Sequence, residues 1–263
     1  MKTDLGALRH FLLDMDGTLY LGDGLIDGAG AFIAFLRESG REVLFFTNNP
    51  TADAASYAEK LQRMGIAASA DDVLTAGAAT IRYLLDETPY RRLYALAAPS
   101  YEAELRAAGL DLDAAEPEAV LLSFDTSLTY EKLVRAADLL RAGLPYIATN
   151  PDKVCPTENG SVPDCGAIAA LLEAATGRTP KYIGKPHPEM VQMALARLGA
   201  EPATTAMVGD RLYTDIAMAH DSGITGILVL SGETKRADLE GADYEPDFVF
   251  DSVAALHAAL RGD

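Results

Sequence analysis

Short apolar runs alternate with amphipathic stretches along most of this 263-residue chain. The runs at 10–13 and 42–46 have the length and composition of buried strands. Between them, Phe32, Ile33 and Leu36 recur at helical spacing, which predicts a helix that leads from one strand to the next. A strand, a helix and a strand in this order predict a parallel sheet with right-handed connections.

The same pattern continues to the end of the chain. Further strands are expected at 73–75, 93–96, 119–124, 146–148, 205–210, 227–230 and 247–250. Helices are expected at 29–36, 51–64, 77–87, 102–108, 131–142, 167–175, 190–198 and 253–260. The polar segment 149–166 is expected to be a long loop, and such loops inside compact domains are often functional.

The order of these elements predicts an α/β protein with two domains. Residues 92–179 contain their own alternation of strands and helices, so they are expected to form a separate α/β unit. We therefore expect a parallel-sheet core made of residues 1–78 and 181–263, with a smaller α/β domain inserted at 79–180.

Composition excludes several classes of function. The formal net charge of -17 argues against a nucleic-acid partner, because a phosphate backbone needs clustered Lys and Arg. The first residues lack the apolar core of a signal peptide, and no run approaches the length of a membrane span. We expect a cytoplasmic protein with no membrane partner. Cys155 and Cys165 lack the paired spacing of a zinc site and are expected to be free thiols.

Asp14 and Asp16 follow the first strand directly. Asp is unfavourable in strands, and at a period of two residues both carboxylates point to the same side. Two like charges at the end of a buried strand require a cation, although a turn at Asp16-Gly17 is an alternative explanation. A calcium loop that starts at Asp14 fits worse, because it would place Leu19 at the glycine position and Leu25 at the glutamate position.

Polar side chains also stand at three later strand ends: Thr47 with Asn48, Lys185, and Asp210 with Asp215. The carboxyl ends of parallel strands meet at one edge of a sheet, where ligands bind, so these side chains are expected to lie together. Phosphoryl transfer through a covalent intermediate needs a carboxylate nucleophile, an acid or base, phosphate donors, a fixed positive charge and a metal ion. Each residue alone also has a structural explanation, such as a helix cap or a solvated charge. The candidates are Asp14, Asp16, Thr47, Asn48, Lys185, Asp210 and Asp215.

Four motifs resemble those of the haloacid dehalogenase superfamily, in the same order and over nearly the whole chain. They are Asp14-Met15-Asp16-Gly17-Thr18, Thr47-Asn48-Asn49, Gly184-Lys185-Pro186, and Gly209-Asp210-Arg211 with Asp215. Two further segments, at 149–152 and 164–167, are similar to the NagD-like, p-nitrophenylphosphatase branch. The resemblance implies a Rossmann-like core and a cap domain inserted into it.

The resemblance also implies roles for the acidic residues. Asp14 would attack phosphorus to form an aspartyl phosphate, and Asp16 would protonate the leaving oxygen and then activate water. The Asp14 side chain, the Asp16 backbone carbonyl and Asp210 would bind Mg²⁺, with Asp215 orienting bound water or Lys185.

The phosphate-binding residues follow from the same resemblance. Thr47, Asn48 and Asn49 would hold phosphate oxygens. Lys185 would join them and act as a catalytic residue, because its charge offsets the charges that Asp14 and a phosphate dianion bring together.

Spacing distinguishes the branches of the superfamily. Asp14 and Thr47 are 33 residues apart, which leaves room for a loop and one helix only. Thr47 and Lys185 are 138 residues apart, and this interval contains the inserted α/β unit, as in the NagD-like branch. Dehalogenation is disfavoured, because dehalogenases of the superfamily do not need magnesium or an acid at the position of Asp16.

The inserted unit is expected to select the substrate. The segment 150–164 should overhang the site, so Asp152, Cys155 and Asp164 are candidates for contact with the leaving group. A solvated loop is an equally good explanation for each of these residues.

The favoured function is a magnesium-dependent phosphatase that hydrolyses small phosphomonoesters, such as nucleotides, sugar phosphates, phosphoglycolate or aryl phosphates. The expected partner is a small phosphorylated metabolite, and the sequence leaves a homo-oligomer open. The alternative is a catalytically weak protein that binds phosphometabolites and acts through a partner. A dinucleotide-binding oxidoreductase is disfavoured, because no Gly-x-Gly-x-x-Gly follows a strand.

Overall fold

The computed structural model describes residues 4–49, 52–157 and 160–262. The chain forms two compact units. The core unit comprises the residues up to 47, residues 54–74 and the residues from 185 onward. The inserted unit comprises residues 48–53 and 75–184. The chain therefore leaves the core unit twice and returns to it twice.

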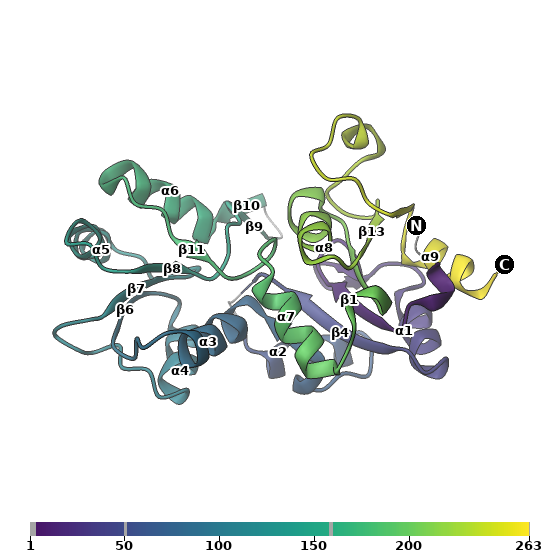
Figure 1. Cartoon of the computed structure of the whole chain (residues 1–263), viewed down its shortest axis with the longest axis horizontal. Helices are drawn as coiled ribbons and strands as arrows, with labels where there is room; N and C mark the ends of the chain where they lie inside the picture. The colour runs from purple at the N-terminus through teal and green to yellow at the C-terminus, as the bar shows by residue number, and fades with distance from the viewer. Residues whose placement is uncertain (1–3, 50–51, 158–159, 263) are drawn as a thin grey trace. The chain divides into compact units, whose positions relative to one another are not determined.

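A parallel sheet forms the centre of the core unit. Its strands, in spatial order, are β14 (Phe248–Phe250), β13 (Thr225–Val229), β12 (Thr205–Gly209), β1 (His10–Asp14), β4 (Glu42–Thr47) and β5 (Val73–Thr75) (Figure 1). β1 lies between β12 and β4 and is parallel to both. Phe11, Leu12 and Leu13 are fully buried, as expected for a strand that is covered on both faces.

Helices connect and cover these strands. They are α1 (Ala29–Glu38), α2 (Ala54–Arg63), α7 (Glu189–Leu198), α8 (Ala217–Ser222) and α9 (Val253–Arg261). α1 buries Phe32, Ile33 and Leu36, the residues whose spacing predicted it. α1 packs beside α9, and α7 packs beside α8. The connection from β1 to β4 and the connection from β12 to β13 run in opposite directions across the sheet. Because both connections are right-handed, α1 and α8 lie on opposite faces of the sheet.

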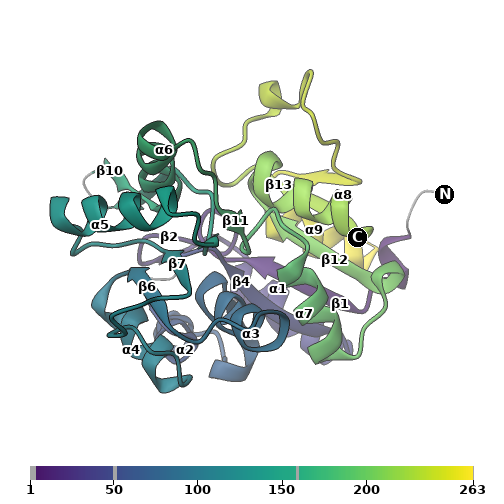
Figure 2. The same cartoon turned by 60° about the vertical axis from the view of Figure 1, so that its left-hand side comes forward.

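The inserted unit has a parallel sheet of its own. Its strands, in spatial order, are β11 (Lys181–Tyr182), β8 (Tyr146–Ala148), β7 (Ala119–Leu122) and β6 (Leu93–Leu96). Its helices are α3 (Ala76–Glu87), α4 (Pro99–Ala107), α5 (Tyr130–Arg141) and α6 (Cys165–Thr176). α5 and α6 cover one face of this sheet, and α3 and α4 lie on the other (Figure 2). Leu122, Leu140 and Leu172 meet in its apolar core.

Two short hairpins were not expected. β9 (Val154–Thr157) and β10 (Gly160–Pro163) form an antiparallel pair within 149–166, so the prediction of a loop there was wrong. Both strands contain a proline, which argues against strand structure in a sequence. β2 (Tyr20–Leu21) and β3 (Gly24–Leu25) form the other pair and are too short for a periodic pattern.

The boundaries of the units differ from the expected 78/79 and 180/181. The Tyr101 hydroxyl donates to the Gly77 carbonyl at 2.9 Å, and this bond joins the first turn of α3 to α4. β11 pairs with β8, so residues 181–184 stay with the inserted unit. Lys185 therefore does not follow a strand of the core sheet, contrary to expectation. It is the first residue of the core unit after the second return of the chain.

Among the described residues, no helix combines the length and the apolar character needed to cross a bilayer.

Candidate active site

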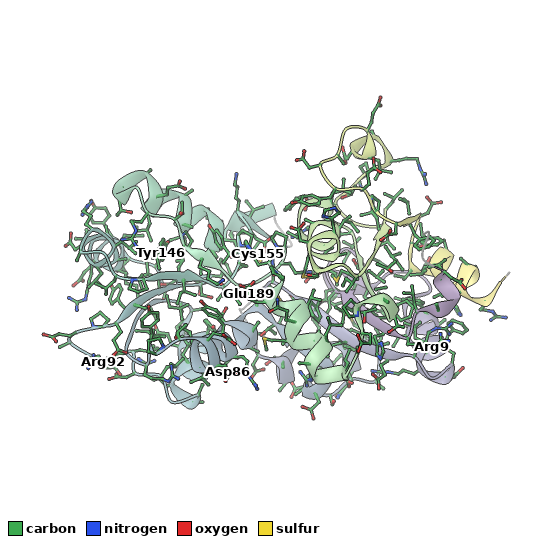
Figure 3. The ribbon with its side chains drawn as sticks, in the orientation of Figure 1. Arg9, Asp86, Arg92, Tyr146, Cys155 and Glu189 are labelled. Carbon is green, nitrogen blue, oxygen red and sulfur yellow. The ribbon has the colours of Figure 1, made fainter. Side chains whose placement is uncertain are left out.

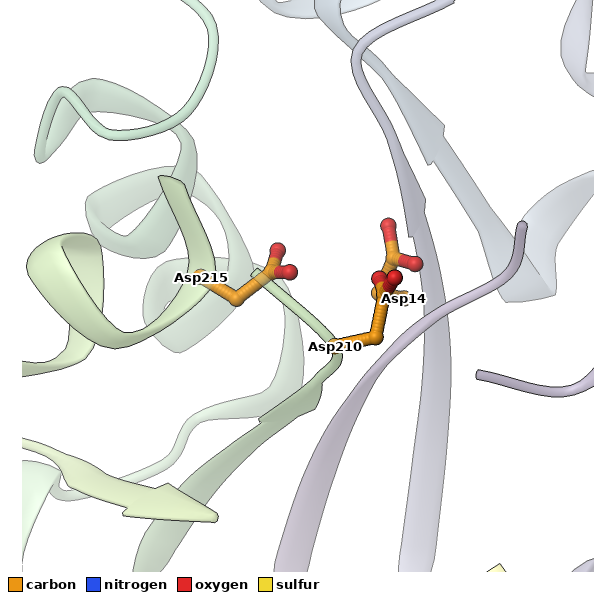
Figure 4. A group of neighbouring side chains, drawn as sticks. All are labelled: Asp14, Asp210 and Asp215. Atoms are coloured by element: carbon orange, nitrogen blue, oxygen red, sulfur yellow. The ribbon is translucent and has the colours of Figure 1, made fainter. Parts of the chain in front are cut away.

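Three buried carboxylates meet at the carboxyl edge of the core sheet. Asp14 ends β1, Asp210 follows the neighbouring strand β12, and Asp215 lies in a π-helical turn at Leu212–Ile216. One oxygen from each carboxylate lies within 4.8 Å of the others (Figure 4). Parallel pairing of β1 and β12 explains why Asp14 and Asp210 are neighbours. Asp215 packs against Gly209, where any larger side chain would overlap it.

Lys185 compensates part of the negative charge of these three residues. Its buried Nζ donates hydrogen bonds to Asp14 Oδ1 and to Asp215 Oδ1, the latter at 2.8 Å. Burial lowers the pKa of Lys185, but the charges of Asp14 and Asp215 outweigh burial, so the pKa lies above its ordinary value. Lys185 is therefore a fixed positive charge at neutral pH.

The carboxylates outnumber the ammonium that pairs with them. Three ionised carboxylates and one ammonium leave two negative charges, which a divalent cation would neutralise. Asp210 Oδ1 is buried and has no hydrogen-bond partner among the residues that the structure describes. Mg²⁺ binds to one or two carboxylates and keeps several waters. The donor set and the unpaired oxygen therefore fit Mg²⁺.

The pKa values of the carboxyls reflect this crowding. Burial raises the pKa of Asp14 well above its ordinary value, Lys185 opposes this effect, and Asp215 and Asp210 reinforce it. Burial and the charge of Asp215 raise the pKa of Asp210 to about 6. A cation bound between the carboxylates would reverse both shifts, because it favours the ionised forms.

Asp16 has a different environment from Asp14, since its side chain is exposed. The Tyr20 hydroxyl donates to Asp16 Oδ2 at 3.3 Å, and Lys60 Nζ lies 4.0 Å from the centre of the Tyr20 ring. Desolvation by surrounding protein atoms raises the pKa of Asp16, while Lys60 and Tyr20 oppose the rise. An accessible carboxyl with a raised pKa is suited to proton exchange with a substrate.

Thr47 lies at the same edge of the core sheet as Asp14. It ends β4, and the preceding residue, Phe46, pairs in register with Asp14. Thr47 is buried. The structure therefore brings Thr47, Asp14, Asp210, Asp215 and Lys185 together in the core unit, although Lys185 arrives from a different element than expected.

Asn48 and Asp152 are hydrogen-bonded to each other within the inserted unit. Asp152 Oδ2 accepts a hydrogen bond from Asn48 Nδ2 at 2.8 Å and another from Asn150 Nδ2 at 2.9 Å. All three side chains are buried. Asp152, predicted as a substrate-contacting residue, thus joins the residue after Thr47 to the segment 150–152.

Asp164 and Cys155 also have definite positions in the inserted unit. Asp164 is the N-cap of α6, where its buried carboxylate accepts from the Cys165 backbone N–H at 2.5 Å. Cys155, on β9, is partly exposed, and its Sγ lies 3.7 Å from Asn49 Nδ2 (Figure 3). Neither cysteine forms a disulfide, in agreement with the prediction, and burial raises the pKa of Cys165 to about 12.

Some residues around the site were given no role from the sequence, although Thr18 belongs to the first motif. Thr18 Oγ1 donates to Asp14 Oδ2 at 3.2 Å, and Tyr20 contacts Asp16 as described above. The turn after β13 also reaches the site, because the Glu233 backbone N–H donates to Asp210 Oδ2 at 2.6 Å. The available signal was a polar Ser-Gly-Glu-Thr segment after an apolar strand.

Two family models match the core of the chain. A model described as haloacid dehalogenase-like hydrolase matches residues 11–111, and a second model of HAD-like hydrolases matches residues 182–256. The first match contains Asp14, Asp16 and Thr47, and the second contains Lys185 and Asp210.

Similar proteins align over nearly the whole chain. An acid sugar phosphatase of Staphylococcus haemolyticus is 37% identical over 96% of this chain and 97% of its own length. The structure of a 4-nitrophenylphosphatase from Thermotoga maritima is 43% identical, with a TM-score of 0.93 over 97% of this chain and 98% of that chain. A glycerol phosphate phosphatase of Mycobacterium tuberculosis, solved with magnesium, is 29% identical, with a TM-score of 0.88 over 98% of this chain and 79% of that chain.

Proposed function

Because the chain belongs to the haloacid dehalogenase-like hydrolase family, in its NagD-like branch, we propose that it is a magnesium-dependent phosphatase working through an aspartyl phosphate. The observation that carries the proposal is the buried Asp14 at the end of β1, paired with Lys185 and grouped with Asp210 and Asp215. The similar proteins named for sugar, aryl and glycerol phosphates support a small phosphomonoester as the substrate.

The first half-reaction forms the aspartyl phosphate. A carboxylate oxygen of Asp14 attacks phosphorus, and the bond between phosphorus and the leaving oxygen breaks. Protonated Asp16 gives its proton to the leaving oxygen, so the alcohol departs neutral. The hydrogen bonds of Asp14 to Lys185 and Thr18 hold the attacking carboxylate in one orientation.

The second half-reaction returns the enzyme to its starting state. Asp16, now ionised, takes a proton from a water molecule that attacks phosphorus. The bond between phosphorus and the Asp14 oxygen breaks, which releases inorganic phosphate and restores both carboxyls to their starting forms. The solvent exposure of Asp16 supports this exchange of protons with water.

The metal ligands proposed are Asp14, Asp210 and the Asp16 backbone carbonyl, with Asp215 holding Lys185 in place. When bound, Mg²⁺ would supply positive charge next to the phosphoryl oxygens. Lys185 supplies a second positive charge there, so that a carboxylate and a phosphate dianion can approach each other.

Thr47, Asn48, Asn49 and Lys185 are proposed to hold the phosphate oxygens. Thr47 offers a hydroxyl at the end of β4, and Asn48 and Asn49 follow it directly. The side-chain nitrogens of Asn48 and Asn49 contact Asp152 and Cys155, which hold the two amides in place.

The test is a phosphate-release screen over sugar phosphates, glycerol phosphates, nucleotides, phosphoglycolate and p-nitrophenyl phosphate, with Mg²⁺ and with EDTA. We expect turnover of several esters that EDTA abolishes and added Mg²⁺ restores. Binding of phosphometabolites without turnover would instead support a binding protein, and turnover unchanged by EDTA would remove the metal from the proposal.

A further inference from the structure

The two carboxylate oxygens of Asp210 have different environments. Oδ1 is buried without a hydrogen-bond partner among the described residues. Oδ2 accepts a 2.6 Å hydrogen bond from the backbone N–H of Glu233. Oδ1 is therefore the oxygen of this carboxylate that has no protein partner among the described residues, and the bond to Oδ2 leaves it available to a metal ion.

Two glycines from different loops crowd the same carboxylate. A side-chain carbon at Gly17 would lie 2.5 Å from Asp210 Oδ2, and the backbone of Gly17 has a φ of +86°. A side-chain carbon at Gly232 would overlap Asp210 Oδ2 outright. Only residues without a Cβ allow the backbone to approach so closely. The Asp210 carboxylate is therefore enclosed on two sides, which limits its rotation.

The turn of residues 231–234 is hydrogen-bonded to both segments that surround the Asp210 carboxylate. Ser231 Oγ donates to the Gly17 carbonyl at 2.8 Å, and the Thr234 backbone N–H donates to the Asp210 carbonyl at 3.2 Å. The turn follows β13, which is parallel to β12, so both strands deliver their next residues to the same edge of the sheet. One turn thus binds both the loop after Asp16 and the backbone of Asp210.

The Glu233 side chain fixes the outer face of the same turn. Its carboxylate forms an ion pair with Arg211 Nε at 2.9 Å and accepts from the Tyr213 hydroxyl at 3.0 Å. Arg211 and Tyr213 lie just after Asp210. The turn is therefore joined to this segment twice, through the Glu233 backbone N–H and through the Glu233 side chain.

We propose that the turn Ser231–Thr234 positions the metal ligand Asp210, with Ser231 and Gly232 as its positioning residues. The inference rests on the proposed function, because it assumes that Asp210 binds Mg²⁺. The backbone N–H of Glu233 holds Oδ2, the two glycines prevent rotation of the carboxylate, and Ser231 keeps the turn joined to the loop at Gly17. Oδ1 would then bind a metal ion without any rotation of the carboxylate.

The expected effect is on metal affinity. Partners of a metal ligand outside the coordination sphere typically contribute about 10-fold to 100-fold to affinity. Ser231→Ala removes one hydrogen bond and should raise the dissociation constant for Mn²⁺ and Mg²⁺ about 10-fold. Gly232→Ala forces the carboxylate to move and should have a larger effect.

The experiment measures metal binding by the full-length protein without substrate. Mn²⁺ is titrated and followed by its electron paramagnetic resonance signal, and Mg²⁺ is measured by competition. Ser252→Ala and Gly30→Ala are matched controls, since Ser252 makes no side-chain capping bond and no atoms lie within 4 Å of a Cβ at Gly30. Both controls should bind like the wild type.

The outcomes distinguish a failure of the proposed positioning role from a failure of the proposed function. Weaker binding by Ser231→Ala, with normal controls and activity recovered at high Mg²⁺, would support the positioning role. Wild-type affinity in Ser231→Ala would overturn it even if Gly232→Ala fails to fold. A wild-type protein that binds no metal would overturn both the positioning role and the metal dependence proposed above.

Discussion

Asp14 is held from two sides by side chains of the core unit. Lys185 donates to Oδ1 and Thr18 donates to Oδ2, so both oxygens have partners. An amide at this position has nearly the same shape, but its nitrogen is neither a nucleophile nor an acceptor. Substitution of Asp14 by Asn therefore tests the loss of the nucleophile while the shape of the side chain is kept.

Asp14→Asn should lower kcat by more than about a thousandfold, as expected for loss of a nucleophile. The melting temperature should change little, and phosphate analogues should still bind in the presence of Mg²⁺. Asp243→Asn, at an exposed position, is the control. Mass spectrometry of acid-quenched wild type should detect a labile phosphate on Asp14, and near-normal turnover in the variant would contradict the covalent mechanism.

Asp16→Asn should damage turnover of alkyl phosphates more than turnover of p-nitrophenyl phosphate. Removal of a general acid typically costs about 10² to 10⁴ in rate, and p-nitrophenolate leaves without a proton. The measurement is kcat/KM for both substrates. Equal losses on the two substrates would argue against Asp16 as the acid.

Glu104 provides a test of pH-dependent stability away from the active site. Burial, together with the charge of Asp53, raises its pKa from 4.5 to about 7. The unfolded chain loses this proton at lower pH than the folded chain, so the stability that Glu104 provides is present below pH 4.5 and is lost as the pH rises toward 7.

Glu104→Gln should therefore stabilise the protein at pH 8 more than at pH 4.5. Melting temperatures of wild type and variant at the two pH values provide the measurement. Glu116→Gln, at an exposed position of the same unit, should show no such difference. An equal effect of Glu104→Gln at both pH values would contradict the raised pKa.

At the scale of elements, the segment 149–166 contains both buried residues with structural partners and a partly exposed residue that could contact a substrate. Asp152 and Asp164 are buried and hydrogen-bonded to Asn48 and to the first turn of α6, respectively, while Cys155 on β9 is partly exposed. The two carboxylates therefore have structural partners. Cys155 remains the most accessible of the three predicted cap residues.

Asp152→Ala and Cys155→Ser should have different effects on a substrate panel. Loss of Asp152 leaves the Asn48 and Asn150 amides without their acceptor, which costs about 1–3 kcal/mol for each buried group, and activity should fall evenly on all substrates. Cys155→Ser should change the ranking of substrates. A uniform loss from Cys155→Ser would show that this residue does not contact the leaving group.

At the scale of the whole molecule, the net charge of -17 opposes the approach of an anionic substrate. The attraction must come from the local charges at the site, namely Lys185 and the proposed metal ion. The Debye length falls from about 30 Å at 0.01 M salt to about 8 Å at 0.15 M, so salt screens the distant charges more than the near ones.

Raising NaCl from about 0.01 M to 0.15 M at constant free Mg²⁺ should therefore raise kcat/KM for phosphate esters, because the Debye length shortens over this range. The kcat value, which describes the bound complex, should change less. Initial rates at several salt concentrations provide both constants. A fall in kcat/KM with salt would show that the local positive charges dominate the long-range field.

Much of the fold and of the site was predictable from the sequence. The alternating strands and helices predicted the parallel α/β core, and the motifs containing Asp14, Thr47, Lys185 and Asp210 predicted the family; the fold class and the family are confirmed. These features depend on local periodicity and on a few polar residues at the ends of apolar runs, which a sequence displays directly.

The tertiary structure decided which residues surround the candidate site. Ser231 and Gly232 lie more than 200 positions from Gly17 along the chain, yet they contact Gly17 and Asp210 because β12 and β13 end at the same edge of the sheet. A buried hydrogen bond likewise joins Asn48 to Asp152 across 104 positions. Such contacts depend on strand order and on close packing between loops, and local residue patterns carry no information about either.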